Sequence, residues 1–186
     1  MEDGIMKTIL MNHLTGRNKT SKQCYLDMYV RSLNEAGKMF NEANILFKRG
    51  AHQRAYFIAF SALEEISKSQ LSADVYTGYI KEEEFKKIYK DHKKKIDRVK
   101  WIQIDANIYP CFRWDGIRVD EFDFKKKLKS LYVDVDFTKN MVSSPTESIS
   151  KEDAEKIIKA VQVGLYQIHY IVDELGEQIG TKGFMK

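Results

Sequence analysis

Residues 55–68 read Ala-Tyr-Phe-Ile-Ala-Phe-Ser-Ala-Leu-Glu-Glu-Ile-Ser-Lys, and this stretch decides the fold. It predicts a helix that is apolar almost all the way round, yet it carries two adjacent carboxylates and a lysine. At about 100° per residue, Glu64 and Lys68 fall on the same face as Phe57. A charge on a mostly buried face is costly unless it is paired or used. We therefore predict a helix inside a bundle, with Glu64, Glu65 and Lys68 as candidate site residues.

The composition is that of an ordinary globular domain. The chain has 186 residues, 43% apolar and 31% charged side chains, and a formal net charge of +4. Cys24 and Cys111 have no CxxC spacing, so we expect two reduced thiols. No apolar run approaches the roughly 20 residues that span a bilayer, and residues 5–14 lack the features of a signal peptide. These patterns favour a cytoplasmic protein that does not enter a membrane.

Hydrophobic periodicity predicts an all-α fold, a helical bundle of about five helices with one long irregular connection. Residues 1–20 are predicted to be an N-terminal extension, 21–180 a single bundle domain and 181–186 a tail. Gly50 and Gly78 mark helix ends, and Ser150 with Asp153 marks a helix start. The predicted helices cover residues 21–48, 52–77, 82–106, 121–131 and 150–177, with a loop at 107–119 and an irregular segment at 132–149.

His92 is the second candidate for a functional residue. It lies on the apolar stripe of the predicted 82–106 helix, between Ile88 and Ile96, with Lys95 at the edge of that face. Such a histidine is more often a hydrogen-bonded core residue than a catalyst. If the second and third helices pack as antiparallel neighbours, His92 approaches Glu64, Glu65 or Lys68.

Positive charge is concentrated on the same predicted helix. Residues 81–100 hold nine basic and five acidic side chains, and Lys125, Lys126, Lys127 and Lys129 form a second basic group. Solvated helix faces are the simpler interpretation. The alternative is an electrostatic surface for RNA, with Lys93, Lys94 and Arg98 as candidate contacts.

Patterns typical of metal or cofactor sites are missing from the sequence. The four histidines are scattered and form no H-x3-H pair, and Glu65 is followed at i+3 by Lys68 where a di-iron bundle has histidine. There is no GxGxxG, P-loop or nucleophile-elbow pattern. We therefore expect no metal and no cofactor.

Several segments carry a joint pattern: Ala36 to Lys48, Gly50, Arg54-Ala55, Ala62-Leu-Glu-Glu-Ile-Ser-Lys68, Phe85 to Lys95, Lys129-Ser-Leu-Tyr-Val-Asp134, Pro145 and the helix from Ser150. The Glu-Glu-x-x-Lys motif is a weak signal alone and is more specific in combination with the spaced histidine and the Leu-Tyr-Val-Asp segment. Together these segments resemble the AbiV-type abortive infection proteins, in the family's order, over roughly residues 33–170.

The resemblance implies an antiphage protein that arrests phage multiplication at the host's cost, with a phage-encoded protein as trigger. It also implies a HEPN-like bundle, a homodimer, and RNA as a possible target. The motif positions are then Glu64, Glu65, Lys68, His92 and Lys95, with Tyr132 and Asp134 as secondary positions.

The chain departs from the HEPN RNases at one motif. Those enzymes usually carry Arg, four to six residues, then His, whereas the nearest pair here is Arg49-Gly-Ala-His52. RNase activity therefore does not transfer residue by residue. If the protein acts on RNA, His92 is the general acid/base, Lys68 or Lys95 stabilises phosphate charge, and Glu65 orients a partner. The alternative is a non-catalytic protein-binding module whose inner polar groups are structural.

Overall fold

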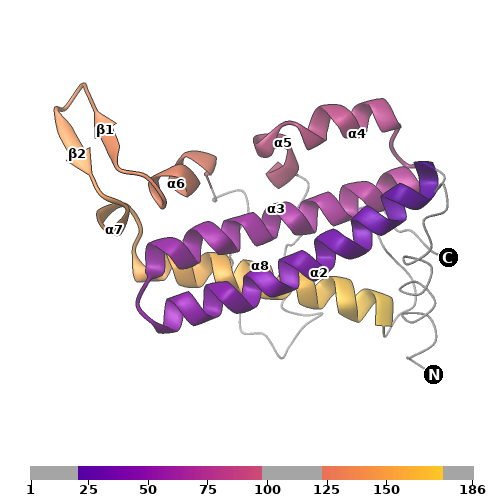
Figure 1. Cartoon of the computed structure of the whole chain (residues 1–186), viewed down its shortest axis with the longest axis horizontal. Coiled ribbons are helices and arrows are strands. Elements are labelled where there is room, and N and C mark those ends of the chain that lie inside the picture. The colour runs from indigo at the N-terminus through magenta and orange to yellow at the C-terminus, as the bar shows by residue number, and fades with distance from the viewer. Residues whose placement is uncertain (1–20, 98–122, 174–186) are drawn as a thin grey trace, which may run out of the picture.

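The computed structural model describes residues 21–97 and 123–173, and these form a helical bundle (Figure 1). Helix α2 (Ser21–Lys48) and helix α3 (His52–Tyr76) lie side by side and antiparallel, joined by three residues. Helix α8 (Lys151–Asp173) packs against both of them. The all-α prediction is confirmed, and α3 is the helix in contact with most of the other elements.

Glycines end the two long helices as the sequence predicts. Gly50 and Gly78 follow α2 and α3 with φ angles of 78° and 79°. This left-handed backbone conformation carries no steric penalty for glycine. The amide of Gly50 donates to the carbonyl of Phe47, and the amide of Gly78 donates to that of Val75. Both ends thus satisfy carbonyls that the helices leave without partners.

Small side chains fill the contact between α2 and α3. Ala36 and Ala43 of α2 and Ala55, Ala59 and Ala62 of α3 are completely buried. Alanine has little volume, so the two helix backbones can approach closely over this length. The larger buried side chains of the same core come from α3 and α8, and they include Tyr56, Phe60, Leu63, Ile66, Ile157 and Val161.

The prediction of one continuous helix over residues 82–106 is wrong in one respect, because its described part forms two separate helices. Helix α4 (Glu82–Tyr89) ends at Lys90, and helix α5 (His92–Asp97) starts after Asp91. The Asp91 carboxylate accepts a hydrogen bond from the amide of Lys94 at 3.2 Å, which is an N-cap interaction. A capping aspartate competes with continuous helix, and α5 consequently starts at His92.

The region after Asp123 holds two further differences from the prediction. Helix α6 (Phe124–Lys129) is shorter than the predicted 121–131 helix, and it starts where the Asp123 side chain caps the amide of Lys125 at 3.0 Å. The segment predicted to be irregular contains a hairpin of strands β1 (Asp134–Asp136) and β2 (Met141–Ser143) and a short helix α7 (Pro145–Ser148). In the hairpin, Val135 is the cross-strand partner of Val142.

The start of α8 is confirmed. Ser150 Oγ accepts from the amide of Asp153 at 3.1 Å, and the Asp153 carboxylate accepts from the amide of Ser150 at 3.0 Å. Other predictions fall outside the described residues, so the structure does not test them. These are the 1–20 extension, Arg98, the 98–106 part of the third helix, the 107–119 loop, and the end of the last helix with the tail.

Within residues 21–97 and 123–173, no helix combines the length and the apolar character that crossing a membrane requires.

The alanine contact gives the first prediction. We expect Ala43→Leu to destabilise the protein by about 1–3 kcal/mol, because the larger side chain has no space between α2 and α3. Urea denaturation followed by circular dichroism measures the loss. The control is Glu42→Leu, since Glu42 is exposed on the same helix. Equal stability of the two variants would show that α2 and α3 do not pack closely at Ala43.

Candidate functional site

The candidate site is centred on the carboxylate of Glu64, in the middle of α3. Glu64 is 6% exposed and lies among the fully buried side chains Leu63 and Ile66. The apolar periodicity that makes α3 the central helix also carries Glu64 into the bundle, as the sequence predicts. A carboxylate at this depth needs partners that compensate for its lost hydration.

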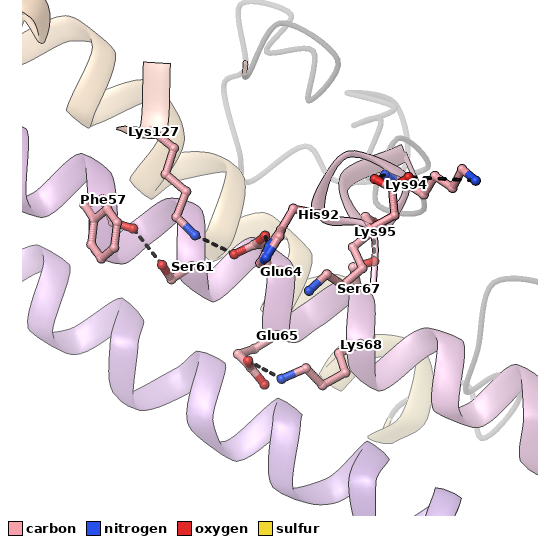
Figure 2. Close-up of polar contacts among 11 residues, drawn as sticks. Phe57, Ser61, Glu64, Glu65, Ser67, Lys68, His92, Lys94, Lys95 and Lys127 are labelled. Atoms are coloured by element: carbon pink, nitrogen blue, oxygen red, sulfur yellow. Dashed lines mark hydrogen bonds and ion pairs between the residues drawn. The ribbon is translucent and has the colours of Figure 1, made fainter. Parts of the chain in front are cut away.

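Two cationic or proton-donating side chains meet Glu64, each from a different element (Figure 2). His92, the first residue of α5, hydrogen-bonds through Nδ1 to Oε1 of Glu64 at 2.6 Å. Lys127 of α6 donates from Nζ to Oε2 at 2.5 Å. Each carboxylate oxygen therefore has one partner. We call Glu64, His92 and Lys127 the Glu64 cluster.

Aromatic rings surround the two partners of Glu64. The Lys127 ammonium lies 5.1 Å from the ring centroid of Phe57, 5.2 Å from that of Phe60 and 5.9 Å from that of Phe124. The His92 ring stacks on Phe124 with centroids 5.2 Å apart and planes 21° apart. Cation–π attraction and stacking therefore hold the donors in place and keep water away from the Lys127–Glu64 pair.

The electrostatics of Glu64 follow from this geometry. Burial alone would raise the pKa of the Glu64 carboxyl, but the hydrogen bonds from Lys127 and His92, together with the positive charge of Lys127, outweigh it and lower the pKa. The carboxylate is therefore the stable form in the folded protein. Because it accepts from Nδ1 of His92, the proton sits on Nδ1, and Nε2 is the nitrogen left for another partner.

Glu65 and Lys68 belong to a different part of the surface of α3. They form an ion pair with each other, and both side chains are 18% exposed. Figure 2 shows this pair apart from the Glu64 cluster. The structure therefore pairs Glu65 with Lys68, and the carboxylate that contacts His92 is that of Glu64.

Lys95 lies between these two groups. It is 7% exposed, and its ammonium lies 5.6 Å from the centroid of the Tyr89 ring, while that of Lys68 lies 5.9 Å from the same ring. The buried Ser67 hydroxyl donates to the backbone carbonyl of Lys95, which anchors α5 on α3. Burial is the main reason that the pKa of the Lys95 ammonium is lowered.

Of the three candidate RNA contacts, the structure describes the side chain of Lys94 alone, and their role in RNA binding stays a prediction. Lys94 is exposed and forms a 3.8 Å ion pair with Asp91. Lys93 is part of α5, and its side chain is not among those described, while Arg98 lies outside the described residues. The secondary motif positions Tyr132 and Asp134 lie after α6, where Tyr132 is 61% exposed and Asp134 pairs with Lys129 at 3.0 Å.

Lys127 is the member of the Glu64 cluster that sequence reasoning missed. In the sequence it is one of several neighbouring lysines, for which a solvated face is the simpler interpretation. The available signal is its spacing from Phe124, since residues at i and i+3 share a helix face and Phe124 packs on the core. Lys127 is 7% exposed, whereas Lys125 and Lys129 on the same helix are exposed.

The Glu64 cluster can support proton transfer. The His92 side chain is 53% exposed although its Nδ1 meets the buried carboxylate. A histidine fixed through one nitrogen, and accessible to solvent, is suited to act as a general acid or base through the other. In the described part of the chain, no three His, Cys, Asp or Glu side chains come together as a metal site would require.

Comparison with known protein families matches most of the chain to a family model. The family model HEPN_AbiV, described as AbiV, matches residues 24–165, which is more than half of the chain. This range contains the whole Glu64 cluster. No curated protein and no solved structure matches the chain.

The buried carboxylate predicts how stability depends on pH. At pH 7 we expect Glu64→Gln to lose about 3 kcal/mol, because it leaves Lys127 buried without its counter-charge. Since the folded-state pKa of Glu64 is lowered, its contribution is fully present above the unfolded value of about 4.3. The difference between wild type and Glu64→Gln should then shrink as the pH falls through the folded-state pKa.

Urea denaturation at pH 7, 5 and 3 measures this difference. Glu155→Gln is the matched control, because Glu155 forms an exposed ion pair with Lys159 at 3.0 Å and such pairs contribute little. A constant gap between wild type and Glu64→Gln over the three pH values would show that the Glu64 carboxylate is not held by the two partners described above.

Proposed function

The chain belongs to the AbiV family of HEPN proteins, and we propose that it is an abortive-infection protein that acts on RNA through the Glu64 cluster. The observation that carries this proposal is a half-exposed histidine fixed by a buried carboxylate, with a lysine on the same carboxylate. In this proposal a phage-encoded component triggers the protein in the bacterial cytoplasm, and the active form is a homodimer. No metal or cofactor takes part.

His92 is the residue proposed to transfer protons. Its Nε2 would accept the proton of a ribose 2′-hydroxyl, whose oxygen then forms a bond to the adjacent phosphorus. The 5′-oxygen leaves with a proton from water, so the products are a 2′,3′-cyclic phosphate and a 5′-hydroxyl. Glu64 supports this step because its carboxylate fixes the imidazole orientation and stabilises the imidazolium that forms.

The positive charges around the histidine fit a phosphodiester substrate. Lys127 belongs to the cluster, and its positive charge helps to lower the pKa of Glu64. Lys95 lies close enough that the charges of Glu64 and Lys127 both act on its pKa. A fixed ammonium group stabilises the negative charge that develops on phosphate oxygens. Exposed lysines on α5 and α6, among them Lys94 and Lys125, would attract the RNA backbone.

A second candidate function has its own support in the structure. Lys127 is almost completely buried between Glu64 and three aromatic rings, which is the environment of a structural ion pair. In this alternative the Glu64 cluster only fixes the position of α5 and α6 on α3, and the protein acts by binding another protein. The absence of the Arg-x4-6-His motif also favours this alternative.

Phage plating tests whether the cluster carries the biological function. We expect wild-type protein to lower the plating efficiency of a sensitive phage, and Lys127→Met to restore plating because it removes the ammonium and keeps a side chain of similar length. The control is Lys159→Met, which breaks the exposed Glu155 pair and should still block plaques. Soluble protein levels are matched by immunoblotting. Equal protection by both variants would place function outside the Glu64 cluster.

RNA cleavage separates the two candidate functions. We expect His92→Ala to lower the cleavage rate of RNA by about 100-fold or more, the usual effect of removing a general base. The same variant should fold, since the His92 side chain is largely exposed. The readout is the appearance of 2′,3′-cyclic phosphate ends in RNA from infected cells and with purified, phage-activated protein. Unchanged cleavage by His92→Ala would favour the structural alternative. An absence of cleavage by the wild-type protein, together with a loss of stability in His92→Ala, would favour it as well.

A further inference from the structure

A concave pocket lies between α2, the C-terminal half of α3 and the end of α4. Its volume is about 360 Å³, which is within the size range of small-molecule sites. The walls are formed by residues of α2 between Cys24 and Ser32, by Lys68 of α3 and by Tyr89 of α4. The pocket is therefore large enough for one small ligand, and the side chains in its walls indicate which kind.

Two cationic side chains line this pocket. Arg31 of α2 is exposed, and Lys68 of α3 forms its ion pair with Glu65. An ammonium group has three hydrogen-bond donors and a guanidinium group has five, so each can contact a further anion beside its present partner. Two such cations favour a ligand that carries a phosphate group.

Tyr89 and Met28 supply the apolar part of the wall. The Tyr89 ring is 40% exposed, and it stacks on the buried Phe85 with ring centroids 5.5 Å apart and planes 25° apart. Phe85 thus fixes the position of the Tyr89 ring at the pocket. An aromatic ring beside a flexible thioether is a surface on which a nucleobase packs.

Two polar groups of α2 can recognise the edge of a base. Asp27 contributes a carboxylate and Ser32 a hydroxyl. Ser32 is only 5% exposed, and within residues 21–97 and 123–173 its hydroxyl has no hydrogen-bond partner. Buried hydroxyls usually have one, so this hydroxyl is placed to bond a polar group inside the pocket. A carboxylate accepts from the amino group of cytosine and repels the carbonyl oxygen at the same place on uracil.

The pocket is close to the Glu64 cluster. Lys68 follows Glu64 by about one turn of α3, a rise of about 6 Å, and Figure 2 shows the Lys95 ammonium between these two side chains. The ammonium groups of Lys95 and Lys68 lie 5.6 Å and 5.9 Å from the centroid of the Tyr89 ring. An RNA strand with one nucleotide at His92 can therefore pass Lys95 and place its next nucleotide in the pocket.

We propose that this pocket binds the nucleotide next to the one that contacts His92, and that it selects a base with an amino group. Arg31 and Lys68 hold the phosphate, the base packs against the Tyr89 ring, and the Asp27 carboxylate accepts from the amino group. The proposal rests on the proposed function for the presence of RNA at His92, whereas binding in the pocket is measured without any cleavage.

Nuclear magnetic resonance of methyl-labelled methionine measures this binding directly. Met28 lines the pocket, and Met39 packs against the main core and serves as the reference. The probes are cytidine 5′-monophosphate, uridine 5′-monophosphate and a cytidine dinucleotide whose 2′-oxygens are methylated, which lacks the attacking hydroxyl. We expect cytidine monophosphate to shift the Met28 methyl signal saturably and uridine monophosphate to bind about 10-fold more weakly. The dinucleotide should shift both the Met28 methyl signal and the His92 ring signals.

Two variants assign the contacts in the pocket. Arg31→Met should weaken the binding of cytidine monophosphate by about 10-fold or more, because it removes a charge-assisted hydrogen bond to the phosphate. Lys38→Met is the matched control, since Lys38 is an exposed cation on the same helix, and it should bind like the wild type. Asp27→Ala should bind the two mononucleotides with equal affinity. Circular dichroism checks that each variant is folded.

The outcomes separate this proposal from the proposed function. An unchanged Met28 signal with all three probes overturns the proposal, and so does equal affinity of the wild type for the two mononucleotides. A dinucleotide that shifts only the His92 signals overturns the pocket and leaves the proposed function intact. If the dinucleotide shifts both signals but unmodified RNA is not cleaved, the pocket stands and the proposed chemistry fails. Binding of mononucleotides without the dinucleotide would identify a free nucleotide as the ligand and would overturn the placement next to His92.

Discussion

The buried carboxylate of Glu64 is the constraint on which the arrangement of the shorter helices depends. It sits in α3, the most buried helix within residues 21–97 and 123–173, where an unpaired charge would cost several kcal/mol. Its two oxygens are satisfied by side chains 28 and 63 residues further along the chain. The positions of α5 and α6 on α3 are therefore set by one carboxylate as well as by apolar packing. This explains why two helices of only six residues each have defined places in the fold.

Much of the bundle could be predicted because its signals are local. The bounds of α2 and α3, their terminal glycines and the start of α8 follow from periodicity and from capping residues that act within one turn. The burial of Glu64 and its approach to His92 also follow, since the face of a helix can be calculated and short connections produce antiparallel neighbours. These inferences need no knowledge of how distant segments meet.

The parts that could not be predicted depend on contacts between distant segments or on competition between similar local structures. Lys127 reaches Glu64 because Phe124 docks α6 on the core. The i+3 spacing from Phe124 selects Lys127 among the neighbouring lysines only once that docking is known. Glu64 rather than Glu65 is the partner of His92 because consecutive side chains point in directions about 100° apart around a helix. The sequence analysis missed the hairpin because two strands of three residues each have too few alternating positions to be distinguished from a loop. It missed the helix break at Asp91 because aspartate is also common on the exposed faces of continuous helices.

The small size of α5 and α6 has a consequence for the dynamics of the protein. The candidate site joins the most deeply buried helix to two short helices that contribute few side chains to the main core. In native-state hydrogen exchange, such units open with less free energy than the global unfolding of the bundle. Slow exchange is thus expected along α3, with faster exchange in α5 and α6. The site can then be disassembled and reassembled while the bundle remains folded, which makes its assembly a step at which a binding partner can act.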